Sequence, residues 1–439
     1  MRRIFLLIVL ASVALVMGCG SGSAPAGVPT GGDSSSNVLT IAVDGGPNPT
    51  QNGPYVNGAF ASATICVPGS TSSCVTVDHL LVDTGSFGLR VLQSALSGLS
   101  LPAVNASNGS PAYDCAAFAD GSFLWGAVDE ANVTLGGETA SNIPIQVVAN
   151  PAGFSIPASC SNGHTNEDTQ ASLGANGILG VGVEPFDCGT ACDPANDNNA
   201  PPSTAPAYFT CTSAGCLPAS VSCSTGCNDT ASLAQVTNPV ILFSTDNNGV
   251  IVELPALPSS GTAANLTGSL IFGIGTKSNN QLASGVDVYT LACDKFNTIF
   301  ENQTFAVNPA KCTGAGSFID SGSKGYFFPN VTSPAITTCP KNTTEGDLSD
   351  FYCPTSTLSL SAINQDPNTL FQGTTVNFSV GNAETLLSSG DAALSMLGGL
   401  QPTGVGFDWG LPFFYGRNVY SAIDGQTVPT TADAPWWAY

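Results

Sequence analysis

One short pattern occurs twice in this chain, at positions far apart in the sequence. In each copy an apolar run leads directly into Asp-(Thr/Ser)-Gly-Ser, at Leu80-Leu81-Val82-Asp83-Thr84-Gly85-Ser86 and at Ser317-Phe318-Ile319-Asp320-Ser321-Gly322-Ser323. The glycine lets other backbone approach closely, so that its N–H can reach the carboxylate. The hydroxyl groups can bond across the turn or to the other turn. Each copy therefore predicts a strand that delivers one carboxylate to the floor of a cleft.

A second element follows each Asp turn at a similar distance. Gly177-Ile178-Leu179-Gly180 ends 97 residues after Asp83, and Phe407-Asp408-Trp409-Gly410 ends 90 residues after Asp320. Two halves with the same layout predict a duplicated lobe.

The composition favours strands and limits the possible partners and sites. The 439 residues include 49 Gly and 30 Pro, which favour many short strands and turns over long helices. With 9 Lys+Arg against 31 Asp+Glu, the formal charge is −22. A chain so poor in basic residues is not expected to bind nucleic acid. With only two histidines, His79 and His164, we expect no His-rich metal site.

These motifs resemble those of the bilobal pepsin-like aspartic peptidases, in the order of that family and over most of residues 39–425. The resemblance implies an all-β, two-lobed pepsin-like fold with a cleft between an N-terminal lobe, 39–275, and a C-terminal lobe, 276–439. The matching segments are the two Asp turns, Asn176–Gly180, the possible lobe-joining strand Gly268–Gly273, and Trp409–Phe414.

The resemblance also implies a catalytic pair, Asp83 and Asp320. Two carboxyls about 3 Å apart hold one shared proton, the behaviour for which aspartic proteases are the standard example. The charged member activates a water and the protonated member donates to the scissile carbonyl. The expected enzyme is an endopeptidase that acts as a monomer on extended polypeptide and needs no metal or cofactor. The supporting turn residues are Thr84, Gly85, Ser86, Ser321, Gly322 and Ser323.

Two positions depart from the family pattern. The segment that resembles the family's flap contains Phe118, Asp120 and Gly121, so that Phe118 stands where the family has a Tyr. Arg90 stands where the family has the Trp that bonds this Tyr. Either the flap is anchored differently, for which Trp125 is a candidate, or Phe118 is part of an ordinary hairpin core. The altered pair keeps open a second function: a catalytically weak or inactive surface protein that binds peptide or glycan.

Two basic residues follow the Asp turns closely: Arg90 seven residues after Asp83, and Lys324 four residues after Asp320. A cation beside the pair would favour its ionised form. Either residue could therefore set the pH optimum or attract acidic groups of a substrate. The alternative is that each pairs with a neighbouring carboxylate.

The N-terminus predicts export and a lipid anchor. A basic start is followed by an apolar run of fourteen residues, Ile4–Met17, which is too short to span a membrane and is typical of a signal peptide. The segment ending at Gly18-Cys19 resembles the lipobox of bacterial lipoproteins, which implies cleavage after residue 18 and lipidation of Cys19. An ordinary signal peptide is the alternative. Residues 19–38 would then be a flexible tether, placing the domain on the cell envelope and, in a Gram-negative host, on the outer membrane.

The cysteines predict a disulfide-bonded, exported protein. Of 15 Cys, 14 remain once Cys19 is set aside. Export to an oxidising compartment favours disulfides, although zinc binding is an alternative for the closely spaced ones. Their spacing suggests the pairs Cys66–Cys74, Cys293–Cys312 and Cys339–Cys353. Six further cysteines occupy an expected surface insertion, about 184–229: Cys188, Cys192, Cys211, Cys216, Cys223 and Cys227.

Overall fold

The computed structural model describes residues 36–105, 109–150, 154–187, 207–212, 215–218, 235–341, 343, 346–401, 404–429 and 432–439. The chain from Ser34 to Tyr439 forms one compact unit. The expected signal segment, Cys19 and most of the Cys-rich insertion lie outside the described residues. Within the described ranges, no helix has the length and apolar character needed to cross a membrane.

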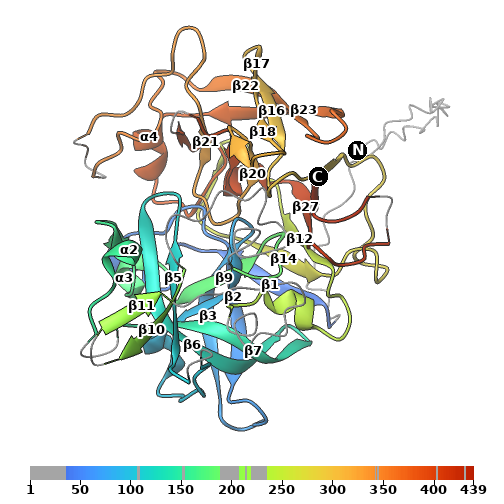
Figure 1. Cartoon of the computed structure of the whole chain (residues 1–439). Coiled ribbons are helices and arrows are strands. Elements are labelled where there is room, and N and C mark those ends of the chain that lie inside the picture. Colours follow the sequence, from blue (N-terminus) through green and yellow to red (C-terminus); the bar gives the residue numbers. More distant parts are fainter. Residues whose placement is uncertain are drawn as a thin grey trace, which may run out of the picture. The chain divides into compact units, whose positions relative to one another are not determined.

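Strands are the main regular structure in the described part of the chain, and the prediction of an all-β, two-lobed fold is confirmed (Figure 1). The helices found there are a few residues long: α1 (Pro49–Asn52), α2 (Ala158–Ser161), α3 (Gln170–Leu173) and α4 (Ala383–Leu387). The absence of long helices follows from the abundant Gly and Pro and the short apolar runs.

The first lobe is formed around one twisted sheet. Strands β2 to β7 and β9 line up in the order β5-β6-β7-β4-β9-β3-β2. Their bounds are β2 (Phe60–Cys66), β3 (Cys74–Asp83), β4 (Phe87–Leu92), β5 (Ala112–Ala117), β6 (Ser122–Leu135), β7 (Glu138–Val148) and β9 (Gly177–Val181).

The internal repeat seen in the sequence is a repeat of strand pairing. In the first lobe β9 runs parallel to β3, with Asp83 opposite Gly180, and antiparallel to β4. In the second lobe β26 (Asp408–Trp409) runs parallel to β20 (Phe318–Ile319) and antiparallel to β21 (Tyr326–Phe328). Each Asp turn therefore follows a strand that pairs with the Gly-ended element predicted for that half.

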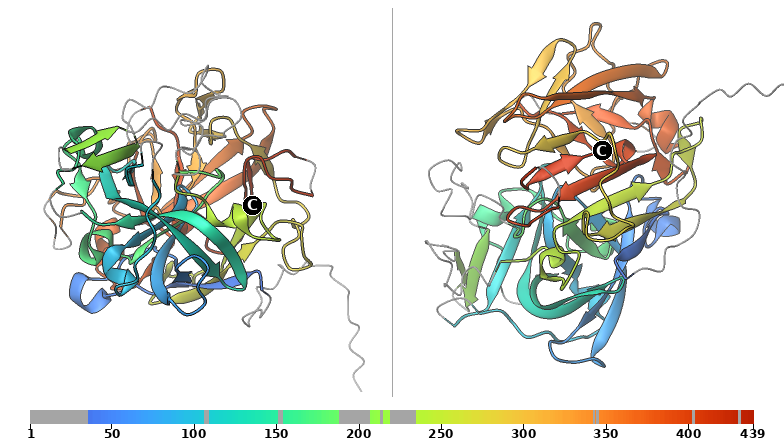
Figure 2. Two further views of the ribbon diagram at one scale, coloured as in Figure 1. Left: turned by 60° about the horizontal axis from the view of Figure 1, so that its bottom comes forward. Right: turned by 90° about the vertical axis from the view of Figure 1, so that its right-hand side faces the viewer.

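The two lobes share strands at their junction. The shared part of the sheet runs in the order β1-β14-β12-β27-β28-β15, so it combines strands from both halves of the chain (Figure 2, right). The lobe boundary at residue 275, which stays a prediction, follows β14 closely. The strand bounds are β1 (Val38–Val43), β12 (Gly249–Leu254), β14 (Leu266–Phe272), β15 (Val288–Thr290), β27 (Arg417–Ala422) and β28 (Trp436–Ala438).

The core of the second lobe is rich in aromatic rings. Phe407 and Trp409 stack at 4.8 Å between ring centroids, and both contact Phe378 from β23 (Gln372–Val380). Phe407 also packs against Phe300 and Phe328. This packing fixes β26, and with it the position of Asp408 beside the second Asp turn.

The structure contains five disulfides among the described residues. The three pairs predicted from close spacing are present: Cys66–Cys74, Cys293–Cys312 and Cys339–Cys353. Cys211–Cys216 joins two members of the insertion cluster, whose other four cysteines lie outside the described residues. Cys115–Cys160, which the sequence analysis did not predict, joins β5 to α2. No group of three or more potential metal ligands occurs in the described ranges.

Candidate active site

The two Asp turns meet, and their hydroxyl residues bond reciprocally. The Thr84 hydroxyl donates to the carbonyl of Ile319 at 3.0 Å and accepts from the Ser321 N–H at 3.0 Å. The Ser321 hydroxyl donates to the carbonyl of Val82 at 2.7 Å and accepts from the Thr84 N–H at 3.1 Å. Both side chains are buried. Each turn is thus held by the strand that carries the other Asp.

Glycine is required in both turns because each carboxyl packs against the backbone of the opposite turn. A Cβ at Gly85 would lie 2.5 Å from Cγ of Asp320, and one at Gly322 would lie 2.8 Å from Cγ of Asp83. Each glycine N–H donates a hydrogen bond to the Asp of its own turn: Gly85 to Asp83 at 2.8 Å and Gly322 to Asp320 at 2.7 Å. These donors hold both carboxyls in fixed orientations.

The two carboxyls lie side by side: a Cβ at Gly322 would lie 2.8 Å from Oδ1 of Asp83 and 3.1 Å from Oδ1 of Asp320. Burial together with the negative charges of Asp83 and Asp408 raises the pKa of Asp320 well above its usual range. The first turn adds a hydrogen bond of 2.5 Å from the Ser86 hydroxyl to Asp83. Two carboxyls in such contact cannot both be charged at low energy, so Asp320 is the member that retains the shared proton. The pair can then present a base and an acid to one water and one carbonyl.

Further polar groups surround the pair. The Lys324 ammonium lies 4.2 Å from the centroid of the Tyr55 ring, and burial lowers the pKa of Lys324 while the nearby carboxylates Glu167 and Asp120 oppose this effect. Tyr55 lies within electrostatic reach of both members of the Asp pair, since their charges, after burial and Glu167, raise the pKa of its hydroxyl. Lys324 and Asp120 were predicted near the site from the sequence, whereas Tyr55 and Glu167 were not, because neither belongs to a recognisable motif.

The expected flap segment is a β-hairpin turn between β5 and β6. Phe118 donates its N–H to the carbonyl of Ser122, Asp120 accepts from the Ser122 N–H and hydroxyl, and Gly121 takes φ +85°. Phe118 packs against an apolar cluster of the first lobe, which also contacts Tyr55. Within the two strands of the hairpin, Trp125 of β6 is fully buried and stacks on Tyr113 of β5 at 5.7 Å. The suggested role of Trp125 in anchoring this hairpin therefore fits its packing.

Arg90 is engaged away from the Asp pair, which corrects the suggestion that it tunes that pair. It is buried, and its guanidinium lies 3.1 Å from Asp187 and 3.7 Å from Asp114. Tyr208 donates to Asp187 at 2.6 Å, so the cluster links β4 to Asp187 and to the start of β10 (Tyr208–Thr212). The alternative stated for Arg90, that it pairs with neighbouring carboxylates, agrees with these contacts.

A third carboxyl, Asp408, was missed as a site residue. Ser323 Oγ lies 2.8 Å from Asp320 and 2.7 Å from Asp408. Asp408 occupies the position that Ile178 occupies in the first half of the repeat, since each lies two residues before the final Gly of its element. A charged residue at an apolar position of an internal repeat was the signal available in the sequence.

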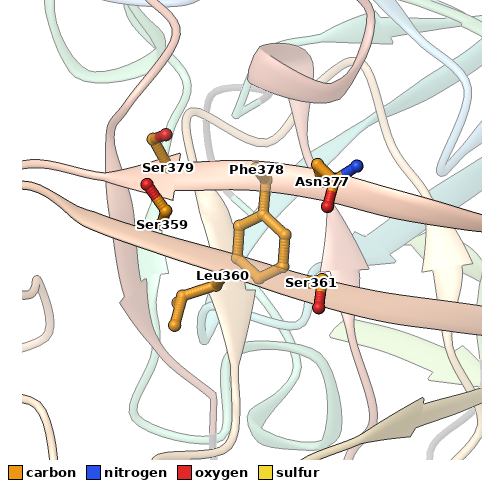
Figure 3. A pocket seen from close by; sticks show the side chains of 6 residues that line it. All are labelled: Ser359, Leu360, Ser361, Asn377, Phe378 and Ser379. Atoms are coloured by element: carbon orange, nitrogen blue, oxygen red, sulfur yellow. The ribbon is translucent and has the colours of Figure 1, made fainter.

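A hollow elsewhere in the second lobe does not belong to this site. It has a volume of about 410 Å³ and lies on β22 (Leu358–Gln365) and β23 (Figure 3). Its lining contains no charged side chain and none of the residues of the Asp turns: Ser359, Leu360, Ser361, Asn377, Phe378 and Ser379.

The duplicated lobes and the paired Asp turns define a class of fold: an all-β, two-lobed protein with one Asp turn from each lobe in contact with the other. The chain itself belongs to the family described as "Protein of unknown function (DUF3443)", whose model matches residues 33–439. No protein with a curated description matches it. A similar solved structure is the crystal structure of aspartic proteinase from Irpex lacteus. The two chains are 16% identical, with 91% of this chain and 96% of that one covered, and the TM-score is 0.45.

Proposed function

We propose that this protein is an aspartic endopeptidase that hydrolyses polypeptides held in extended form between its lobes, as a monomer and without a cofactor. The observation that supports this most directly is the pair of carboxyls, Asp83 and Asp320, which lie side by side on reciprocally bonded turns. Two groups whose environments separate their pKa values are suited to act as acid and base in one reaction.

In the proposed reaction, ionised Asp83 takes a proton from a water molecule as that water attacks the carbonyl carbon of the peptide. Protonated Asp320 donates to the carbonyl oxygen, so that no free oxyanion forms. The N–H groups of Gly85 and Gly322 and the hydroxyls of Ser86 and Ser323 keep the two carboxyls aligned through the step. The hairpin containing Phe118, Asp120 and Gly121 would cover the bound peptide.

Digestion of casein and of a peptide library by the full chain, from acidic to neutral pH, tests this function. Asp83→Asn and Asp320→Asn should each abolish cleavage, and pepstatin should inhibit the unaltered protein. Thermal melting of both variants shows whether they are folded. Cleavage that survives either substitution in a folded protein would exclude the two-Asp mechanism.

A second function remains because the flap lacks the family's Tyr and Trp. A protein of this fold that binds peptide or glycan without cutting it would show saturable binding and no cleavage at any pH. The two proposals therefore differ in one measurement, the appearance of new N-termini in a bound peptide.

Lys324 is the basic residue that could act on substrates. Its ammonium lies over Tyr55, which is within electrostatic reach of the Asp pair. We propose that it adjusts the pH optimum or favours acidic side chains in a substrate. Lys324→Met should then shift the pH profile or reduce the preference for acidic peptides, and an unchanged profile and preference would remove this role.

We also propose that the protein is a bacterial lipoprotein anchored to the cell envelope through Cys19. The support is the sequence pattern around Gly18-Cys19. Labelling with a radioactive fatty acid should mark the full chain and should fail for Cys19→Ser. Release of the unaltered protein in soluble, unlabelled form would favour the ordinary signal peptide instead.

A further inference from the structure

The two halves of the repeat differ at one position beside the Asp pair. In the first lobe the Ser86 hydroxyl meets one carboxyl, Asp83, at 2.5 Å. In the second lobe the Ser323 hydroxyl meets two, at 2.8 Å from Oδ2 of Asp320 and 2.7 Å from Oδ2 of Asp408. The extra carboxyl stands at the register position of Ile178, so nothing in the strand pairing itself requires it.

The hydrogens around Ser323 can be counted. A hydroxyl has one hydrogen and can donate to one carboxyl only. The second short contact is therefore a hydrogen bond only if one of the two carboxyls carries a proton and donates it to Ser323 Oγ. If both were ionised, one negatively charged oxygen would face an oxygen of the hydroxyl at 2.7–2.8 Å without a hydrogen between them.

The surroundings show which carboxyl donates. Asp408 is buried, and no group in the described ranges donates to its Oδ1. Asp320 receives a hydrogen bond from the Gly322 N–H at 2.7 Å. A buried carboxylate with an unsatisfied oxygen is costly, so the neutral acid is the favoured form of Asp408.

The charges near Asp408 act in the same direction. The negative charge of Asp83 disfavours a further negative charge on Asp408. Lys324, which follows the second Asp turn, lies over Tyr55. From the neighbouring strand β21, Tyr326 is bonded to Arg417, which also donates to the carbonyl of Phe413. Burial, opposed by the Ser323 bond and supported by the charge of Asp83, raises the pKa of Asp408 to about 8.

We propose that Asp408 is a positioning residue of the Asp pair: its protonated carboxyl donates to Ser323, and Ser323 donates to Asp320. Through this chain Asp408 fixes the direction of the Ser323 hydroxyl, and so the orientation of the second carboxyl of the pair. The first lobe has no counterpart, because Ile178 cannot donate. The consequence for catalysis rests on the proposed peptidase function, but the protonation of Asp408 does not.

Carbon-13 NMR of the full chain, labelled at the aspartate carboxyl carbon, tests the protonation directly. We expect one carboxyl signal in the acid form at pH 6 that titrates near pH 8 and is missing from Asp408→Asn. Ser323→Ala should move this titration, whereas Ser86→Ala, the matched change in the other lobe, should leave it in place. If the signal missing from Asp408→Asn is already ionised at pH 6, the proposal is overturned.

Kinetics with a cleavable peptide test the positioning. Asp408→Asn keeps an N–H donor toward Ser323 and should lower kcat only a few-fold. Asp408→Leu, which copies the apolar residue of the first lobe, should lower kcat by about tenfold to a hundredfold with little change in KM. Equal losses in the two variants, or no loss in Asp408→Leu, would overturn the positioning role. If the unaltered protein cleaves nothing but the NMR result holds, the peptidase function fails and the protonated Asp408 stands.

Discussion

Thr84 and Ser321 hold the two lobes together at the Asp pair by exchanging hydrogen bonds in both directions. Each hydroxyl accepts from the backbone N–H of the other residue and donates to a carbonyl on the opposite strand. Both residues are buried, so water does not offer a replacement partner. The contact therefore couples lobe packing to the geometry of the carboxyls.

Thr84→Val tests this coupling, because it removes the hydroxyl and keeps the shape of the side chain. The buried N–H of Ser321 loses its acceptor, and we expect the free energy of unfolding to fall by about 1–3 kcal/mol, as measured by urea denaturation. Thr84→Ser keeps the hydroxyl and is the control, with a clearly smaller loss. Equal stability of the Val variant and the unaltered protein would show that the exchanged bonds contribute nothing.

The close approach at Gly322 predicts a loss of function. In Gly322→Ala the new Cβ would lie 2.8 Å from Cγ and Oδ1 of Asp83, so one carboxyl must move. A displacement of this size at reacting groups should lower kcat by about a hundredfold in a peptide-cleavage assay.

Gly69→Ala is the control for Gly322→Ala. Gly69 has φ +75° in the turn between β2 and β3, and a Cβ there meets no atom within 4 Å. It should lose about 1–2 kcal/mol of stability through backbone strain and keep its cleavage rate. A Gly322→Ala variant as active as Gly69→Ala would contradict the close packing at the pair.

The Asp turns were predictable from the sequence because the determinants are local and occur twice. An apolar strand, an Asp and a Gly within a few residues define each turn, and the repeat defines its partner. The three predicted disulfides were also local, each closing a loop of 8 to 19 residues. Cys115–Cys160 spans 45 residues and depends on how the β5–β6 hairpin meets α2, which no spacing rule reveals.

The environment of the Asp pair was less predictable, because it depends on tertiary packing. Arg90 was expected near the pair from its distance along the chain, but its side chain points to Asp114 and Asp187. Tyr55 and Glu167 come from segments without a motif and reach the site only through the fold. The sequence shows Asp408 within a repeat element, but its role follows only from its contact with Ser323.

The Arg90 cluster predicts a large structural effect. Arg90→Met leaves two buried carboxyls, Asp114 and Asp187, without their cation, and we expect the free energy of unfolding to fall by about 3–5 kcal/mol. Burial and the charge of Asp187 raise the pKa of Asp114 well above its usual range, and Arg90 opposes this. The folded chain holds a proton on Asp114 that the unfolded chain releases, and removal of Arg90 raises this pKa further. The loss of stability in the variant should therefore grow as pH rises above the folded-state pKa of Asp114 in the unaltered protein.

Urea denaturation across this pH range measures the effect of Arg90→Met. Arg417→Met is the matched control, since Arg417 contacts the carbonyl and ring of Phe413 rather than a buried carboxyl pair. It should show a smaller loss without this pH dependence. A loss at Arg90 that is small and independent of pH would mean that the cluster is not a buried ion pair.

The raised pKa of Asp408 predicts how stability changes with pH. Its value is about 8 in the folded chain against the ordinary 3.8, so between these pH values the folded state holds a proton that the unfolded state has released. Each pH unit in that window then lowers the free energy of unfolding by up to about 1.4 kcal/mol. Asp408→Asn cannot ionise and should gain stability relative to the unaltered protein as pH rises from 4 to 8.

Asp129→Asn is the control, at a carboxyl whose pKa burial raises to about 6. This variant should gain stability relative to the unaltered protein only up to about pH 6. Urea denaturation of the three proteins at each pH gives the comparison, and parallel curves for Asp408→Asn and the unaltered protein would show that Asp408 is ionised in the folded chain.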